Sequence, residues 1–216
     1  MIRNIKALGL AVFAVMALGA FSAATASAEK LFHSEVAHTE VRGEQHSTED
    51  TFTVNAGTVR CSHATYTGTQ STATASTQTV APTYSGCKAF GFVNTTIDPN
   101  GCGYVFSLSG TPVSGAAPGG VTIECPAGQV ITVTAFNCWV TVGPQTRATG
   151  ITYTNLGAGK TRDVTVDVNL TGLTYTQHSK SFPGCTNGTF NNGTYTGAAT
   201  VRGFDTAGEQ VGVWVN

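Results

Sequence analysis

The sequence predicts an all-β protein, an antiparallel β-sandwich of the immunoglobulin-like or jelly-roll-like kind, cross-linked by disulfide bonds. Threonine occurs 36 times, and its β-branched side chain favours the pleated surface of a strand. Short segments of alternating apolar and polar residues recur between turn residues, and no amphipathic helix is expected beyond the first 28 residues. All six cysteines, an even number, also lie beyond those residues.

The first 28 residues have the pattern of a signal peptide. Arg3 and Lys6 precede an apolar run from Ala7 to Phe21, and Ala26-Ser27-Ala28 has the small residues of a signal cleavage site. The apolar run is shorter than the ~20 residues that span a bilayer, which favours a cleaved signal over a membrane anchor. No later segment is apolar for long enough to span. We therefore expect an exported protein, either secreted or held at the cell surface.

Residues 29–216 are sufficient for one large β domain, and we expect a single domain with a possible break near 109–120. This mature part has nine Lys and Arg against twelve Asp and Glu, a net charge of −3 with neutral histidine. Such a balance does not suggest nucleic acid or an anionic membrane as partner, because both favour a basic patch. Charged residues are only 11% of the chain, so threonine hydroxyls must supply much of its solubility.

The first half of the mature chain alternates in the manner of strands, with one ambiguous stretch. Thr67–Thr79 has no apolar face, which is compatible with a linker and equally with an exposed ribbon whose Thr and Ser pair on both faces. Pro82 indicates an edge position, because proline cannot donate to a neighbouring strand. The expected strands are Leu31–Val41, Thr51–Asn55, Val59–Tyr66 and Thr79–Tyr84.

The segment from Cys102 to Cys125 predicts a hairpin with a defined register. The two arms are aligned antiparallel so that the residue numbers of each cross-strand pair sum to 227. In this register every large apolar residue lies on one face. Because side-chain direction has a period of two, a slip of one residue would destroy this agreement. The register pairs Tyr104 with Ile123, Phe106 with Val121 and Cys102 with Cys125, so we expect a disulfide across the hairpin.

The second half of the chain continues the pattern. Val130–Val142 is expected to be one long strand whose inward-facing phase switches near Ala135–Phe136, and a β-bulge there would reconcile the two phases. Further strands are expected at Thr149–Thr154, Asp163–Leu170, Leu173–Gln177, Thr194–Val201 and Gln210–Val215.

The six cysteines indicate three disulfides, because an even number follows a signal peptide. A metal site would require close pairs such as Cys-x-x-Cys, which the sequence lacks. Once the hairpin disulfide is assigned, a preference for neighbours along the chain favours Cys61–Cys87 and Cys138–Cys185.

The sequence contains no catalytic motif: it lacks Gly-x-Ser-x-Gly, HExxH, a phosphate-binding loop and GxGxxG. His33 and His38 are five residues apart and would point to opposite faces of a strand, so they do not predict a metal site. We expect no enzymatic activity, no metal and no cofactor. A secreted hydrolase that uses carboxylates such as Glu124, Asp163 or Asp167 is the least favoured alternative.

Trp139 and Trp214 are the candidate binding residues. Trp139 is out of phase with Cys138 and Val140, and Trp214 is likewise out of phase with the valines on either side. The two rings therefore cover a second core face or are exposed, and an exposed tryptophan can stack on a sugar. A glycan-binding module is accordingly the alternative function.

The segments Thr51–Cys61, Pro82–Cys87 and Val211–Val215 resemble secreted bacterial β-rich proteins, and the resemblance extends over most of the mature chain. The Ala-x-Ala signal and the Thr-, Ala- and Gly-rich composition also look bacterial. No activity is established for those proteins, so the resemblance assigns no site residues. We expect a non-enzymatic structural or interaction role at or outside the cell envelope, with an extracellular glycan or an envelope component as partner.

Overall fold

The computed structural model describes residues 29–46, 48–181 and 184–216, so the expected signal peptide at 1–28 lies outside the described residues. The described chain is all-β apart from one 3-10 turn, η1 (Gly159–Thr161), and none of its helices is long and apolar enough to cross a membrane. The strands are β1 (Phe32–Ser34), β2 (Thr39–Gln45), β3 (Asp50–Val54), β4 (Gly57–Gln70), β5 (Thr74–Ala75), β6 (Thr77–Ala89), β7 (Val93–Asp98), β8 (Gly103–Leu108), β9 (Ala116–Glu124), β10 (Ile131–Ala135), β11 (Cys138–Val142), β12 (Gln145–Leu156), β13 (Asp163–Ser179), β14 (Gly188–Phe204), β15 (Gln210–Val211) and β16 (Val213–Val215).

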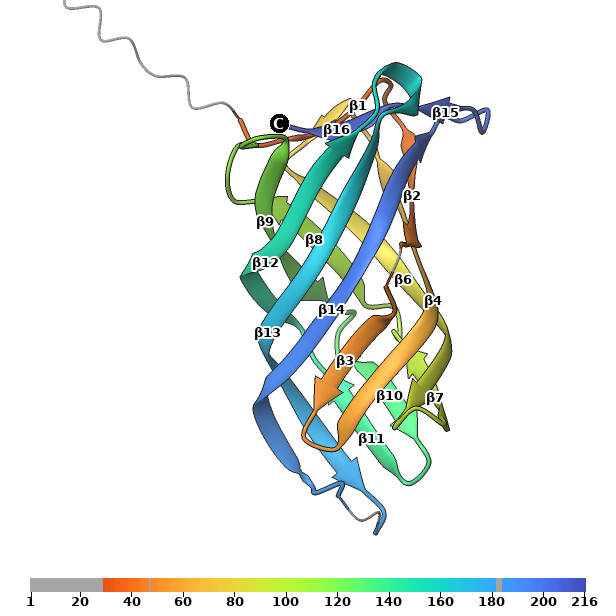
Figure 1. The fold of residues 1–216 in the computed structure, drawn as a ribbon, viewed down its shortest axis with the longest axis vertical. Helices are drawn as coiled ribbons and strands as arrows, with labels where there is room; N and C mark the ends of the chain where they lie inside the picture. The colour runs from red at the N-terminus through yellow and green to blue at the C-terminus, as the bar shows by residue number, and fades with distance from the viewer. Residues whose placement is uncertain (1–28, 47, 182–183) are drawn as a thin grey trace, which may run out of the picture.

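Eight strand positions close into an antiparallel barrel, and their order around the wall follows the chain (Figure 1). Four positions are filled by single long strands, β4, β6, β13 and β14. The other four are each filled by two shorter strands that lie between the same two neighbouring positions of the wall: β2 with β3, β7 with β8, β9 with β10, and β11 with β12. The barrel is therefore an elongated up-and-down barrel.

The closed barrel replaces the expected two-sheet sandwich. Sandwiches and barrels both need strands with one apolar and one polar face, so alternation along the sequence does not separate them. Long-range pairing decides the architecture. β2 lies beside β14, with Gly43 opposite Val201, which joins the first and last parts of the described chain and closes the ring. The inward-facing apolar residues consequently share one interior.

The predicted hairpin register is confirmed. β8 and β9 pair Tyr104 with Ile123 and Phe106 with Val121, and the disulfide between Cys102 and Cys125 lies just beyond their ends. The segment 109–120, where a break was considered, contains the connection between these two strands and the start of β9. The other two disulfides, Cys61–Cys87 and Cys138–Cys185, are also those expected.

The β-bulge expected near Ala135–Phe136 is wrong, because the chain reverses there. β10 and β11 form a hairpin that pairs Ala135 with Cys138, and Phe136 and Asn137 are its turn residues. Phe136 has φ 52°, in the left-handed region that tight hairpin turns use. A reversal shifts the inward-facing phase in the same way as a bulge, so the phase change alone could not distinguish the two.

Other segments differ in detail from the sequence prediction: the strands expected at Asp163–Leu170 and Leu173–Gln177 are one strand, β13, and Gln210–Val215 is divided into β15 and β16. The strand expected at Leu31–Val41 is divided into β1 and β2 by bends at 35–38. The ambiguous Thr-rich stretch is largely strand, since β4 continues to Gln70 and β6 begins at Thr77. Pro82 is not on an edge strand as expected, because β6 lies between β4 and the strands β7 and β8, and Pro82 itself is opposite Tyr66 of β4. Only its other side is locally open, since β8 pairs with β6 up to Val80 and β7 pairs from Lys88.

A small sheet in the order β16-β1-β5 covers one end of the barrel, which we call the cap end. The Phe32 ring packs edge-on against the buried Tyr153, with ring centroids 5.4 Å apart. The Asn155 side chain fixes β16 by donating to the Val215 carbonyl at 2.8 Å and accepting from the Val215 N–H at 2.9 Å. The cap is thereby tied to β12 of the wall.

Candidate ligand site inside the barrel

The interior of the barrel contains a cavity of about 140 Å³. All eight positions of the wall contribute lining residues, and Phe32 and Trp214 contribute from the cap. Apart from a few polar groups, the lining consists of aliphatic and aromatic side chains. An apolar cavity of this size can hold a molecule comparable to benzene, and eight-stranded barrels are just wide enough to enclose one small ligand.

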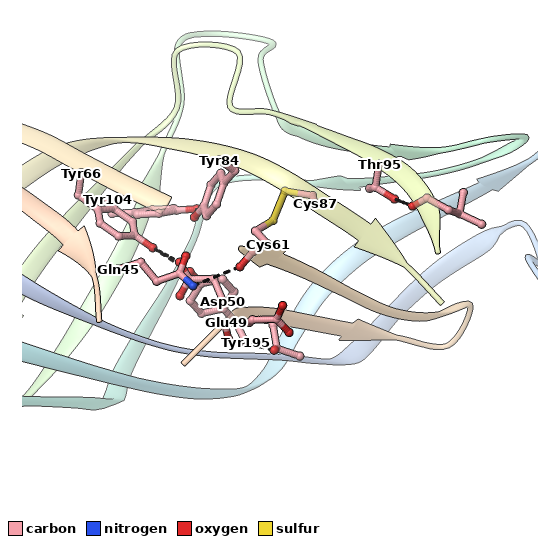
Figure 2. The surroundings of a disulfide bond; sticks show 12 residues. Gln45, Glu49, Asp50, Cys61, Tyr66, Tyr84, Cys87, Thr95, Tyr104 and Tyr195 are labelled. Carbon is pink, nitrogen blue, oxygen red and sulfur yellow. Dashed lines mark hydrogen bonds between the residues drawn. A yellow bond between two sulfur atoms is a disulfide. The ribbon is translucent and has the colours of Figure 1, made fainter. Parts of the chain in front are cut away.

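A carboxyl and four phenols form the main polar group of the cavity. Tyr66 donates its hydroxyl hydrogen to Oδ2 of Asp50 at 2.9 Å, and its oxygen lies 3.0 Å from the Tyr195 hydroxyl. The hydroxyls of Tyr84 and Tyr104 lie 2.8 Å apart. Figure 2 shows these side chains converging beside the Cys61–Cys87 disulfide. We call Asp50, Tyr66, Tyr84, Tyr104 and Tyr195 the Asp–Tyr cluster.

Local sequence explains why Asp50 points inward. On β3 it shares a phase with the inward-facing Phe52, and its own exposed fraction is only 3%. The absence of a side chain at Gly197 makes room for it, because a Cβ at that position would lie 1.8 Å from Oδ1 of Asp50. The carboxyl is therefore a built part of the interior.

Burial determines the electrostatics of the Asp–Tyr cluster. It raises the pKa of the Asp50 carboxyl above its ordinary value of 3.8, and hydrogen bonds from Tyr66 and Tyr195 partly oppose this rise. Burial also raises the pKa of each of the four phenols, so they remain neutral donors and acceptors at physiological pH. Within the described residues Asp50 forms no ion pair with a Lys, Arg or His. The cavity thus presents an unbalanced carboxyl among hydroxyls.

A second polar atom lies at the cap end of the cavity. His33, from β1, lines the cavity, and its Nε2 is buried without a hydrogen-bond partner in the described part of the chain. The imidazole stacks on Trp214 with centroids 5.1 Å apart, and the Arg162 guanidinium lies 4.8 Å from the centre of the same indole. Cap residues therefore place an unsatisfied nitrogen at the cap end of the cavity.

The structure does not bring the two candidate tryptophans together. Trp214 belongs to the cap strand β16, whereas Trp139 is in β11, which pairs with β13 far from the cap. Trp139 stacks on His178 with centroids 5.1 Å apart, and Nζ of Lys180 lies 5.6 Å from its centre. Each indole thus already has an imidazole against it.

The carboxylates considered for hydrolysis are also separated. Asp163 accepts hydrogen bonds from Arg202 and Gln210, whereas Glu124 is exposed at the end of β9. Asp167 lines an open polar groove on the outer wall, which Glu49 also lines. Among the described residues no three His, Cys, Asp or Glu side chains gather as metal ligands.

Sequence reasoning missed the Asp–Tyr cluster, although one signal was present. Asp50 is in phase with Phe52 and Val54, and an acidic residue on the apolar phase of a strand is unusual. The tyrosines gave no comparable signal, because they come from four different strands that only the barrel brings together. Comparisons with protein-family models, with curated proteins and with solved structures find no match, so a function has to be inferred from the geometry of the barrel.

Proposed function

We propose that this chain is an extracytoplasmic, non-enzymatic binding protein that holds one small amphiphilic molecule inside its barrel. The observation that carries the proposal is a buried carboxyl, Asp50, without a cationic partner in the described chain, facing an apolar cavity. The three disulfides support an oxidising location outside the cytoplasm.

The Asp–Tyr cluster defines the polar part of the ligand. A buried charge is costly unless it is paired, so a ligand ammonium group beside Asp50 would offset the cost of ionising the carboxyl. Aromatic rings around such a group favour a cation further. Most of the remaining lining, including Val121, Ile151 and Val166, is apolar and favours an apolar body. We therefore propose a small amine with an aromatic or short aliphatic body.

A glycan-binding module that uses Trp139 or Trp214 is less well supported, because an imidazole already stacks against each indole. If the protein has a purely structural role, the cavity holds no ligand. The binding experiment described next would then detect no binding of any probe.

The proposal can be tested with three probes that share one apolar body: benzylamine, benzyl alcohol and toluene. Binding is followed at neutral pH by isothermal titration calorimetry and by chemical-shift changes of the interior tyrosines. We expect benzylamine to bind most tightly. Asp50→Asn should weaken benzylamine binding about tenfold or more while leaving benzyl alcohol nearly unchanged, because only the amine requires the carboxylate.

Asp167→Asn, on the outer wall, is the matched control and should leave all three affinities unchanged. Val166→Phe adds bulk to the lining and should block every probe. If no probe perturbs the interior tyrosines at millimolar concentration, or if Asp50→Asn affects amine and alcohol alike, the proposal is wrong.

A further inference from the structure

The end of the barrel opposite the cap, which we call the hairpin end, gathers the turns of several hairpins. The Phe90 N–H donates to the Thr58 carbonyl at 3.2 Å, which links the β6–β7 turn to β4. The Lys180 N–H donates to the Asn137 carbonyl at 2.8 Å, which links the β13–β14 connection to the β10–β11 turn. These turns therefore form one continuous surface (Figure 1).

Large apolar side chains protrude from this surface. Phe92 is 78% exposed and Phe136 is 73% exposed, and Phe90 adds a ring that is 40% exposed. β7 and β10 are neighbours that pair Thr95 with Ala135, so the turns carrying Phe92 and Phe136 are adjacent. Scattered exposed apolar residues are ordinary, but phenylalanines on neighbouring turn tips form a patch that requires an explanation.

The charge at the hairpin end has a single sign. The segments 55–60, 86–96, 134–140, 176–181 and 184–190 contain Arg60, Lys88 and Lys180 and no aspartate or glutamate, although residues 29–216 as a whole are acidic. Arg60 and Lys88 are directly opposite each other on β4 and β6, and both are exposed. Arg60 also lines the outer-wall groove that Glu49 and Asp167 line, so Lys88 is the member of this pair that is left to attract an anion.

Trp139 extends the aromatic surface up the outer wall. It is out of phase with the buried Cys138 and Val140, and it is only partly buried. Tryptophan and lysine at the rim of an apolar tip are the residues that occupy the headgroup level when a protein meets a bilayer. The hairpin end thus has apolar tips, an aromatic rim and a positive charge.

We propose that the hairpin end docks on the surface of an anionic phospholipid bilayer, with the phenylalanine tips entering the interface. Shallow insertion of apolar side chains combined with attraction of basic residues to anionic headgroups is sufficient for reversible binding. The net charge of −3 does not oppose this, because the carboxylates lie in other segments and surface charges act within about 10 Å at 0.1 M salt. This inference is independent of the ligand proposed for the cavity.

The test is co-sedimentation of the mature, disulfide-bonded protein with vesicles of phosphatidylcholine alone and of phosphatidylcholine with phosphatidylglycerol. Binding should require the anionic lipid and fall as sodium chloride rises. Phe92→Ser with Phe136→Ser should weaken binding about tenfold or more. Lys88→Gln with Lys180→Gln should weaken it about 25-fold, since each basic residue near the surface contributes about fivefold.

Matched controls come from the cap end, where Val113 is 74% exposed and Lys160 lies in η1. Val113→Ser and Lys160→Gln should bind vesicles as the parent protein does, and circular dichroism should show that every variant is folded. Equal binding to neutral and anionic vesicles, or an equal loss in the cap-end controls, would overturn the proposal. So would a dimer that the phenylalanine variants dissociate without any vesicle binding, because a second copy would then occupy this surface.

Discussion

Tyr66 donates a hydrogen bond of 2.9 Å to Oδ2 of Asp50, sixteen residues earlier in the chain and one strand away in the wall. This bond places a carboxyl inside an apolar barrel and provides it with a neutral donor instead of a cation. The arrangement makes the interior sensitive to pH and leaves the carboxyl able to accept a charged ligand.

Asp50 should make stability depend on pH in the mildly acidic range. Because its folded pKa is raised above 3.8, the folded state binds more protons than the unfolded state between the two pKa values. The contribution of Asp50 to stability is complete below pH 3.8 and is lost as pH rises through the folded pKa. Urea unfolding from pH 3.5 to 7 should therefore show the free energy of unfolding of the parent falling relative to that of Asp50→Asn. A constant difference would contradict the burial of this carboxyl.

The interior phenols should resist ionisation at alkaline pH. Burial raises the pKa of Tyr66, Tyr84, Tyr104 and Tyr195 well above 10, and of Tyr153 as well. These groups stabilise the fold below pH 10, and the stability is lost as pH rises above that value. These are five of the six tyrosines, so most of the rise in absorbance at 295 nm should come only together with unfolding measured by circular dichroism. Gradual ionisation of several tyrosines near pH 10 in the folded protein would show that these phenols are accessible to solvent.

The Cys138–Cys185 disulfide should contribute strongly to stability. It closes the longest loop of the three, with a sequence separation of 47 residues, and connects β11 to the β13–β14 connection. Replacing both cysteines with serine should lower the free energy of unfolding by about 3–4 kcal/mol. Equilibrium denaturation measures the loss, and mass spectrometry establishes that the other two disulfides remain. A variant as stable as the parent would refute this role.

Gly119 should tolerate no side chain. A Cβ there would lie 2.3 Å from the Ser107 carbonyl oxygen and 2.3 Å from the Tyr153 ring. Gly119→Ala should cost about 1–3 kcal/mol, because backbone and a buried ring must both shift. Gly143→Ala is the control, since its nearest neighbour is 3.9 Å away. Thermal unfolding compares the two, and equal melting temperatures would show that the wall can yield at Gly119.

Asn155 should determine how firmly the cap is held. Asn155→Ala removes both hydrogen bonds to Val215 and leaves backbone groups at the edge of β16 without partners, at a cost of about 1–3 kcal/mol. Hydrogen exchange of the Val215 amide should become faster while amides of β8 and β9 keep their protection. Unchanged exchange at Val215 would show that packing alone, including Phe32 against Tyr153, fixes the cap.

The sequence by itself determined the elements and several of their local relationships. Alternation identified the strands, and the hairpin from Cys102 to Cys125 could be assigned its register because a slip of one residue would turn every apolar side chain outward. The same logic failed at Phe136, where a reversal and a bulge change the phase alike.

Only the tertiary structure decided that the sheet closes, which residues share the interior and which turns share an end. Closure depends on pairing β2 with β14, and the strands of an open sheet would carry the same alternation. Asp50 and Tyr195 meet because β3 pairs with β14, and Phe92 and Phe136 are neighbours because β7 pairs with β10. Side-chain phase is a local property of the backbone, whereas proximity between strands distant in sequence arises only from the global arrangement of the sheet.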